Sequence, residues 1–172
     1  MSANLKINKK DHIKGNENAS VEILEYADYQ CPYCRDAYFI LKKLQNEFGQ
    51  DIKFVFRNFP LTELHQYALH AALAAESAAL QGKFWEMHDI LLEQQENLQD
   101  EDILKYAQEI GLDITKFKHD FESDEVFNKV EADFESAEEY GVNATPTIYI
   151  NGEKYKGDWM NAGFFRYIKS LI

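Results

Sequence analysis

Cysteine is scarce in this chain of 172 residues, which contains only Cys31 and Cys34. Because both belong to one Cys-x-x-Cys motif, the chain cannot build a framework of structural disulfides. The pair is therefore available for catalysis or for metal binding, unless it has no function at all.

Long apolar runs and excess positive charge are absent as well. No apolar run reaches the length of a transmembrane helix, so we expect no insertion into a membrane. The formal net charge of −12 argues against nucleic acid or an anionic membrane as a partner. Residues 1–15 are polar and lysine-rich and lack the apolar core of a signal peptide. We expect a cytoplasmic protein if this N-terminus is native, and a periplasmic or other extracytoplasmic one if a signal peptide was removed.

What the chain does contain is typical of a folded globular protein. Hydrophobic residues make up 45% of it and aromatic residues 14%, which is enough to bury a sizeable core. No internal repeat or low-complexity tract interrupts the sequence. The length suits a single unit, residues 1–172, with room for an inserted subdomain.

The first third of the chain predicts a strand, a helix and a strand. Residues 21–27 are mostly apolar and typical of a central strand, except for the carboxylate of Glu25. Residues 35–48 carry apolar side chains at helical spacing, and residues 52–58 alternate as a strand does. Short links between them indicate a βαβ unit with parallel strands. Residues 1–20 are expected to be a solvent-exposed lead-in.

Residues 61–141 contain no convincing strand and predict an all-helical block. We expect helices at 67–80, at 84–94 and at 100–111 with Asp100 as the N-cap. After a turn near 113–121, a last long helix is expected to carry the apolar residues from Val126 to Tyr140 and to end at Gly141. The acidic residues within 122–139 are expected to form a solvated helix face. A strand at 147–150, a hairpin at Asn151-Gly152, a return strand at 153–156 and a helix capped by Asn161 complete the chain.

The position of the Cys-x-x-Cys motif indicates redox chemistry. It lies where the first predicted strand turns into the first predicted helix, and a helix N-terminus stabilises a thiolate through its unpaired N–H groups and partial positive charge. The thiolate is the nucleophile of disulfide exchange. Zinc would need four ligands, and the five histidines form no ligand-spaced pair. We therefore expect no metal.

Several stretches of the chain resemble the DsbA-like thioredoxin family. They are residues 11–16, 24–34, 57–61, 81–88 and 141–147. The resemblance implies an α/β protein with a thioredoxin fold, βαβ followed by ββα, and an all-helical insertion between the two halves. The thioredoxin-like domain would comprise residues 20–60 and 142–172, and the insertion subdomain residues 61–141.

The resemblance also implies roles for individual residues. Cys31 would be the attacking thiol and Cys34 the resolving one, with no cofactor besides their redox-active disulfide. Pro146 would be a cis-proline lying against the motif, with the backbone of Thr145 pairing with an extended substrate chain. Glu25, six residues before Cys31, would be a buried acid that exchanges a proton with Cys34.

The residues around the cysteines are expected to contact substrate. Pro32 and Tyr33 lie between them, and Tyr29, Tyr33, Phe59 and Pro60 could form an apolar rim that suits unfolded peptide segments, although ordinary strand-end packing explains them equally well. The Pro-Tyr dipeptide departs from the Pro-His of the strongly oxidising periplasmic prototype, so we expect a less oxidising pair.

Two alternatives to a DsbA-like exchange enzyme stay open. Pro-Tyr is also the dipeptide of glutaredoxins, with potentials of about −200 to −230 mV, which allows a glutathione-linked reductase. A non-catalytic peptide-binding or chaperone module could use the same groove. We expect the protein to be a monomer whose substrates are protein or peptide thiols and disulfides, and we expect a redox partner that recycles the cysteine pair. The sequence leaves the direction of electron flow undecided.

Overall fold

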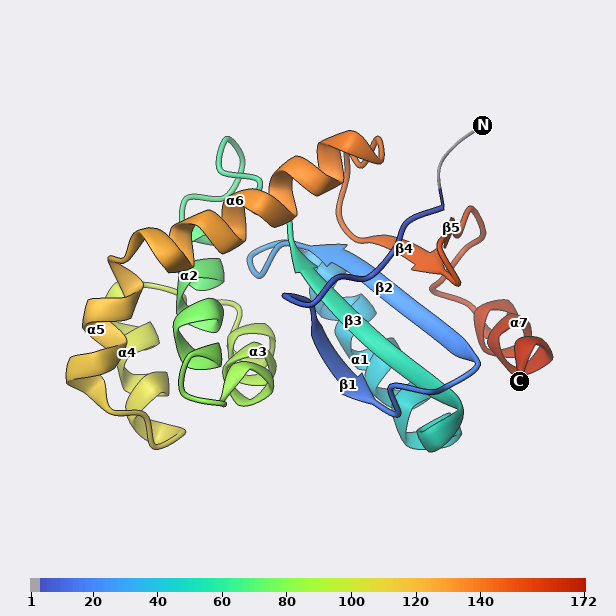
Figure 1. Cartoon of the computed structure of the whole chain (residues 1–172), viewed down its shortest axis with the longest axis horizontal. Helices are drawn as coiled ribbons and strands as arrows, with labels where there is room; N and C mark the ends of the chain where they lie inside the picture. Colours follow the sequence, from blue (N-terminus) through green and yellow to red (C-terminus); the bar gives the residue numbers. More distant parts are fainter. Residues whose placement is uncertain (1–3) are drawn as a thin grey trace.

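The computed structural model describes residues 4–172 as a five-stranded mixed sheet with helices around it (Figure 1). The sheet order is β1-β3-β2-β4-β5. Its strands are β1 (His12–Gly15), β2 (Val21–Ala27), β3 (Ile52–Asn58), β4 (Thr147–Ile150) and β5 (Glu153–Lys154). The pair β2 and β3 is parallel, and the remaining neighbours are antiparallel.

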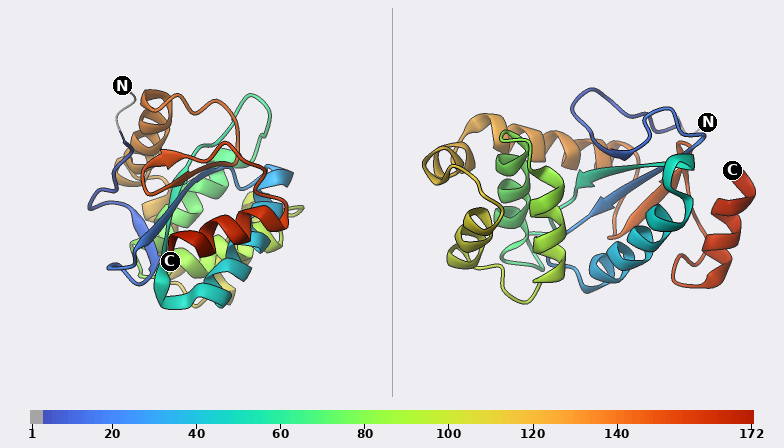
Figure 2. Two further views of the ribbon diagram at one scale, coloured as in Figure 1. Left: turned by 90° about the vertical axis from the view of Figure 1, so that its right-hand side faces the viewer. Right: turned by 90° about the horizontal axis from the view of Figure 1, so that it is seen from below.

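The helices form two groups. Helices α1 (Pro32–Phe48) and α7 (Ala162–Leu171) belong to the halves of the chain that build the sheet, and they pack on the same face of it (Figure 2). The second group lies at one end of the sheet in Figure 1, and its last helix extends from there along the sheet. It contains α2 (Ala68–Ala79), α3 (Phe84–Glu93), α4 (Asp100–Glu109), α5 (Ile114–Phe121) and α6 (Asp124–Glu139). The order βαβ, helical block, ββα confirms the predicted α/β thioredoxin fold with a helical insertion.

Alternation along β2 divides the core into two layers. Val21 and Ile23 point toward α1 and join its apolar face, whereas Leu24 and Tyr26 point to the opposite face, where α6 and the N-terminal segment cover the sheet. Successive side chains of a strand point to opposite faces. Glu25 therefore faces the same side as Ile23, toward α1 and the helical block.

Three predictions about local structure were wrong. Residues 1–20 were expected to be a solvent-exposed lead-in, but within the described residues 4–20 β1 pairs with the edge of β3 and Leu5 is buried. Only one residue of this short polar strand is strongly apolar, so its pattern was too weak to detect. The segment predicted as a turn is the helix α5, capped by the Asp113 side chain. The N-cap of α4 is Gln99, one residue before the predicted Asp100.

A further difference concerns the start of α1. This helix begins at Pro32 and not at residue 35, because proline suits the first helical position, where its missing N–H is not needed. Within residues 4–172, no helix is long and apolar enough to cross a membrane.

Buried charged residues fasten the N-terminal segment and α6 to the sheet. Arg57 of β3 is 2% exposed and forms a two-pronged ion pair with Asp11, with nitrogen–oxygen distances of 2.8 Å. The same guanidinium donates to the hydroxyls of Tyr26 and of Ser136 on α6, at 2.8 and 2.9 Å. The donors of Arg57 are thus matched by acceptors from three separate parts of the chain.

The end of β3 is held by a second network. Asn58 donates from its side-chain nitrogen to Glu76 of α2 and to Asp133 of α6, at 2.8 and 2.9 Å. His12 lies within 2.8 Å of Glu76, and Lys129 within 2.6 Å of Asp133. Asp133 is 4% exposed, so the prediction that the acidic residues of 122–139 only form a solvated face was wrong for this residue.

The Arg57–Asp11 pair predicts a large cost for removing one partner. Asp11→Ala leaves a buried guanidinium without its carboxylate, and we expect the free energy of unfolding to fall by about 3 kcal/mol or more. The measurement is urea denaturation followed by circular dichroism. Lys105→Ala, which removes a surface pair with Glu109, is the control and should have almost no effect. Equal losses in the two variants would contradict the assignment.

Candidate active site

The two cysteines lie at the start of α1, which follows β2 after a short loop, residues 28–30. Cys31 is the N-cap residue, and Cys34 is in the first turn. The side chains are free thiols in this structure, and Cys31 and Cys34 are 5% and 1% exposed. Because the helix starts at Pro32, the backbone N–H groups of Tyr33 and Cys34 belong to its first turn, next to Cys31.

Cys31 is the more acidic thiol. Its pKa is lowered to about 5, chiefly because the Cys34 thiol donates a hydrogen bond to its sulfur. The N–H groups of Cys34 and Tyr33 lower it further and, together with that hydrogen bond, outweigh the opposing effect of burial. In its thiol form, Cys31 donates to the Thr145 carbonyl at 3.6 Å. At neutral pH Cys31 is therefore a thiolate, the form that attacks disulfides.

The pKa of Cys34 is shifted in the opposite direction. Burial raises its pKa well above 9, and donating to Cys31 and lying near the charge of Glu25 raise it further. The backbone N–H of Asp28 points at the Cys34 sulfur from 3.5 Å and partly offsets these effects. Cys34 thus keeps its proton at neutral pH and needs a base before it can act as a nucleophile.

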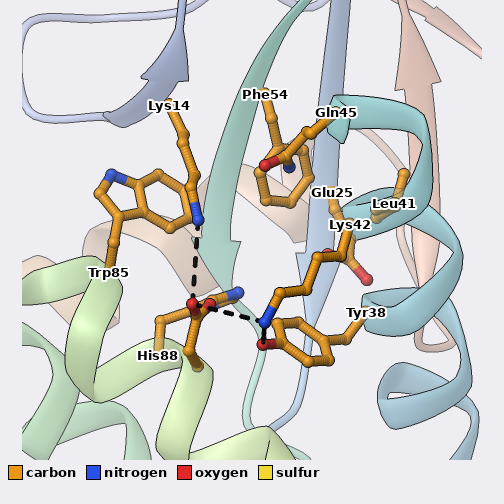
Figure 3. A pocket seen from close by; sticks show the side chains of 10 residues that line it. Lys14, Glu25, Tyr38, Leu41, Lys42, Gln45, Phe54, Trp85 and His88 are labelled. Atoms are coloured by element: carbon orange, nitrogen blue, oxygen red, sulfur yellow. Dashed lines mark hydrogen bonds and ion pairs between the residues drawn. The ribbon is translucent and has the colours of Figure 1, made fainter. Parts of the chain in front are cut away.

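Glu25 is the carboxyl group on this side of the sheet. It is 2% exposed, and its pKa is raised to about 8 by burial and by the charge of Cys31. Its Oε1 atom has no hydrogen-bond partner within the described residues. Glu25 is one of the residues that line a narrow cavity, and in Figure 3 its side chain lies next to that of Lys42 of α1. A carboxyl group with this pKa can both accept and release a proton near neutral pH.

The remaining predicted site residues surround the cysteines. The Thr145–Pro146 peptide bond is cis, as the resemblance implies. Thr145 brings its carbonyl to Cys31, and its hydroxyl has no hydrogen-bond partner among residues 4–172. Pro32 is exposed, and Tyr33 has 59% of its surface in solvent. The fold thus brings together segments that are more than a hundred residues apart.

The expected apolar rim is narrower than predicted. Tyr33 is exposed, but Tyr29 and Phe59 are only 1% and 4% exposed and belong to the core. The Tyr29 hydroxyl forms a 2.9 Å hydrogen bond with Nδ1 of His88. Tyr29 therefore joins β2 to the helical block and does not offer a surface to substrate.

Two further residues support the site, and neither was predicted. Gln95 donates from its amide to the carbonyls of Tyr29 and Cys31, at 2.8 Å each. Asp28 accepts hydrogen bonds from the backbone of Leu61 and lies 2.8 Å from Nδ1 of His65. Both hold the loop before α1 against the insertion. Gln95 is 64 residues away from Cys31 in sequence, so no local pattern could have identified it.

Metal binding has no support in the described structure. Among residues 4–172, no three histidine, cysteine, aspartate or glutamate side chains are placed to hold an ion. Such a pair of cysteines alone supplies half of a structural zinc site.

Comparison with known proteins points to one family. A thioredoxin family model matches residues 7–170. A thioredoxin-like oxidoreductase from Silicibacter pomeroyi is 26% identical with a TM-score of 0.83, covering 95% of this chain and 92% of that one. BdbD from Bacillus subtilis, in its oxidised form, is 26% identical with a TM-score of 0.82, covering 95% and 93%. The thiol-disulfide exchange protein alpha-DsbA2 from Wolbachia pipientis shares the fold at 24% identity, with a TM-score of 0.83 and coverage of 96% and 89%.

Curated relatives place a similar segment inside longer proteins. The Na(+)/H(+) antiporter NhaA 1 of Mycolicibacterium vanbaalenii is 40% identical over 163 residues, which are 94% of this chain and 26% of the antiporter. NhaA 3 of Salinispora tropica is 39% identical over 150 residues, 87% of this chain and 23% of that protein. The chain thus spans about a quarter of the length of these relatives.

The opposed pKa values of the cysteines predict selective alkylation of the reduced protein. Iodoacetamide should modify Cys31 with a midpoint near pH 5, measured by mass spectrometry after brief exposure at each pH. In Cys34→Ala the midpoint should move upward, because that variant loses the hydrogen bond that lowers the Cys31 pKa most. In Cys31→Ser, Cys34 should react slowly at pH 7. A wild-type midpoint near the ordinary thiol value of roughly 8.5 would contradict this assignment.

Proposed function

The chain belongs to the DsbA-like thioredoxin-fold family, and on that premise we propose that it is a thiol–disulfide oxidoreductase that acts on protein or peptide thiols through Cys31 and Cys34. The observation that carries the proposal is the opposite displacement of the two thiol pKa values at one helix N-terminus. Cys31 is the thiolate that attacks, and Cys34 stays protonated until the second step.

The reaction in the reducing direction has two steps. The Cys31 thiolate attacks a substrate disulfide, forms a mixed disulfide and releases one substrate sulfur as a thiolate. Glu25 then takes the proton of Cys34, and the Cys34 thiolate attacks the Cys31 sulfur. The Cys31–Cys34 disulfide forms, and the second substrate sulfur leaves. Two electrons pass to the substrate, and the oxidising direction is the reverse of these steps.

Glu25 suits the second step because its pKa depends on the state of Cys31. Besides burial, the charge of the Cys31 thiolate raises that pKa. In the mixed disulfide Cys31 carries no charge, so the pKa of Glu25 falls and more of it is ionised. The base therefore becomes available at the stage at which Cys34 must lose its proton.

The acidity of Cys31 favours an oxidising pair. A lower pKa of the attacking cysteine stabilises the reduced form and makes the disulfide a stronger oxidant. The Cys31 value of about 5 lies between those of thioredoxin and DsbA, roughly 7 and 3.5. We therefore propose a reduction potential between about −270 and −120 mV. A potential near about −120 mV would suit an oxidising, extracytoplasmic compartment, and a potential near about −270 mV would suit the cytoplasm.

The exposed chain segments near Cys31 support a polypeptide as substrate. Thr145, whose carbonyl lies 3.6 Å from the Cys31 sulfur, is part-exposed, and Pro32 and Tyr33 are exposed. An extended peptide can add hydrogen bonds along such an edge. We propose no cofactor beyond the cysteine pair itself, and a recycling partner that restores its redox state.

Trapping of an intermediate tests the roles of the cysteines. Incubated in its reduced form with a disulfide-bonded peptide, Cys34→Ser should accumulate a mixed disulfide, because it lacks the thiol that resolves this intermediate. Cys31→Ser should accumulate none. Non-reducing gel electrophoresis and mass spectrometry of the adduct provide the measurement. Equal trapping by both variants would refute the assigned roles.

Catalysis and potential separate this proposal from its alternatives. The wild-type protein should accelerate the reduction of insulin by dithiothreitol, whereas a non-catalytic binding module would only suppress aggregation. A glutathione-linked reductase would instead turn over small glutathione mixed disulfides rapidly. Equilibration with glutathione redox buffers should give a potential within the proposed range, and a value below that of thioredoxin would contradict an oxidising pair.

A further inference from the structure

The loop before α1 is bound to the helical insertion by three side chains. Asp28 and Gln30 accept hydrogen bonds from backbone N–H groups in the segment between β3 and α2, at 2.8 Å each. Gln95, in the loop between α3 and α4, donates from its side-chain nitrogen to the carbonyls of Tyr29 and Cys31, also at 2.8 Å each. Of these three side chains, Gln95 is the one that binds the attacking residue itself.

The carbonyl oxygen of Cys31 is shared by three N–H donors. The Gln95 side chain is the nearest, at 2.8 Å, and the backbone nitrogens of Cys34 and Arg35 follow at 3.0 and 3.3 Å. A carbonyl oxygen has only two lone pairs, so these donors compete for it. Gln95 therefore helps to set the direction in which this carbonyl points. Since the carbonyl and the side chain of Cys31 share one backbone, that direction also determines where the sulfur lies.

The loop that carries Gln95 is itself anchored. The carbonyl of Asn97 accepts a hydrogen bond from the Tyr106 hydroxyl at 2.7 Å, and the N–H of Asn97 donates to the carbonyl of Gln94 at 2.8 Å. Leu98 is 2% exposed and belongs to the core. A side chain on such a support holds its partner in one place, which is what a positioning residue requires.

The contact with Gln95 also has an electrostatic consequence for the sulfur. A thiolate on Cys31 lies near the negative ends of two carbonyl groups, its own and that of Thr145 at 3.6 Å. An N–H group that binds its own carbonyl offsets part of that negative charge and so stabilises the thiolate. Because the Gln95 contact is part-buried, water screens it less than it screens a surface contact.

We infer that Gln95 is a positioning residue for the exchange reaction: by binding the Cys31 carbonyl from the helical insertion, it holds the sulfur beside Thr145 and favours the reduced form of the cysteine pair. The inference rests on the proposed function, in which Cys31 attacks the substrate. Gln95 acts through the backbone of Cys31, and what it changes is the equilibrium between the dithiol and the disulfide.

The test replaces Gln95 by methionine. Gln95 lines an open cleft of about 490 Å³ beside the motif, together with Gln30, Pro32 and other residues, so truncation to alanine would admit water as a substitute donor. Methionine is unbranched, of nearly the same length and without an N–H group. The variant Gln95→Met therefore removes both hydrogen bonds and keeps the space filled.

The first readout is the redox equilibrium with glutathione. Two glutathione molecules reduce the Cys31–Cys34 disulfide to the dithiol and become one glutathione disulfide. In Gln95→Met the equilibrium constant for this reduction should fall by about threefold or more. The alkylation midpoint of Cys31 should rise by about 0.5 pH units or more, because one pH unit in the midpoint corresponds to tenfold in the constant. Mass spectrometry of acid-quenched, alkylated samples measures both quantities.

Gln81→Met is the matched control. The Gln81 amide also binds a loop through two hydrogen bonds, donating to the carbonyl of Asp113 at 3.1 Å and accepting from its N–H at 2.9 Å, but this contact lies within the helical insertion. Its equilibrium constant and midpoint should stay at the wild-type values. Wild-type values in Gln95→Met, or equal changes in the two variants, overturn the inference. A wild-type cysteine pair that does not equilibrate with glutathione would instead overturn the proposed function.

A measurement without a Gln95 variant provides a second test. In NMR spectra of the reduced wild-type protein, the side-chain amide resonances of Gln95 should shift as the pH passes through the Cys31 midpoint near pH 5. This shift should be absent in Cys31→Ser, which keeps the titration of the neighbouring carboxylates. Gln95 resonances that stay fixed in the wild-type protein, or that move equally in Cys31→Ser, overturn the inference.

Discussion

The hydrogen bond between the two cysteines is the interaction on which the rest of the site depends. It lowers the pKa of Cys31 more than any other contact does, and it raises that of Cys34. The bond requires one sulfur at the N-cap and the other in the first turn, and this arrangement follows from the start of α1 at Pro32. A helix that began three residues later would separate the thiols from the N–H groups that support the charge.

The sheet supplies the second requirement, an acid beneath the cysteines. Glu25 points to the α1 side because it alternates with Leu24 and Tyr26, whose side chains fill the opposite core. The same strand ends just before the motif, so the acid and both sulfurs belong to one continuous segment. Burial, and not a neighbouring partner, is the main reason for the raised pKa of Glu25.

The helical insertion completes the site from a distance. Buried networks around Arg57 and Asn58 attach α2, α6 and the N-terminal segment to β3. With the block held in this position, α3 lines the narrow cavity next to Glu25, and Gln95 binds the carbonyl of Cys31. The insertion is thereby part of the environment of the cysteines and not a separate appendage.

The sequence by itself determined the fold class, the bounds of β2 and β3, and the placement of the cysteine motif at a strand–helix junction. These features depend on local periodicity, spacing and helix-end chemistry, which are readable along the chain. Strand β1 and helix α5 were missed because their short patterns are weak without the surfaces that they cover. Only the tertiary structure decided that Tyr29 is buried, that Gln95 and Asp28 hold the loop, and that Glu25 lines a narrow cavity together with residues of α1 and α3. Desolvation and contacts between distant segments exist only after packing, so no spacing in the sequence records them.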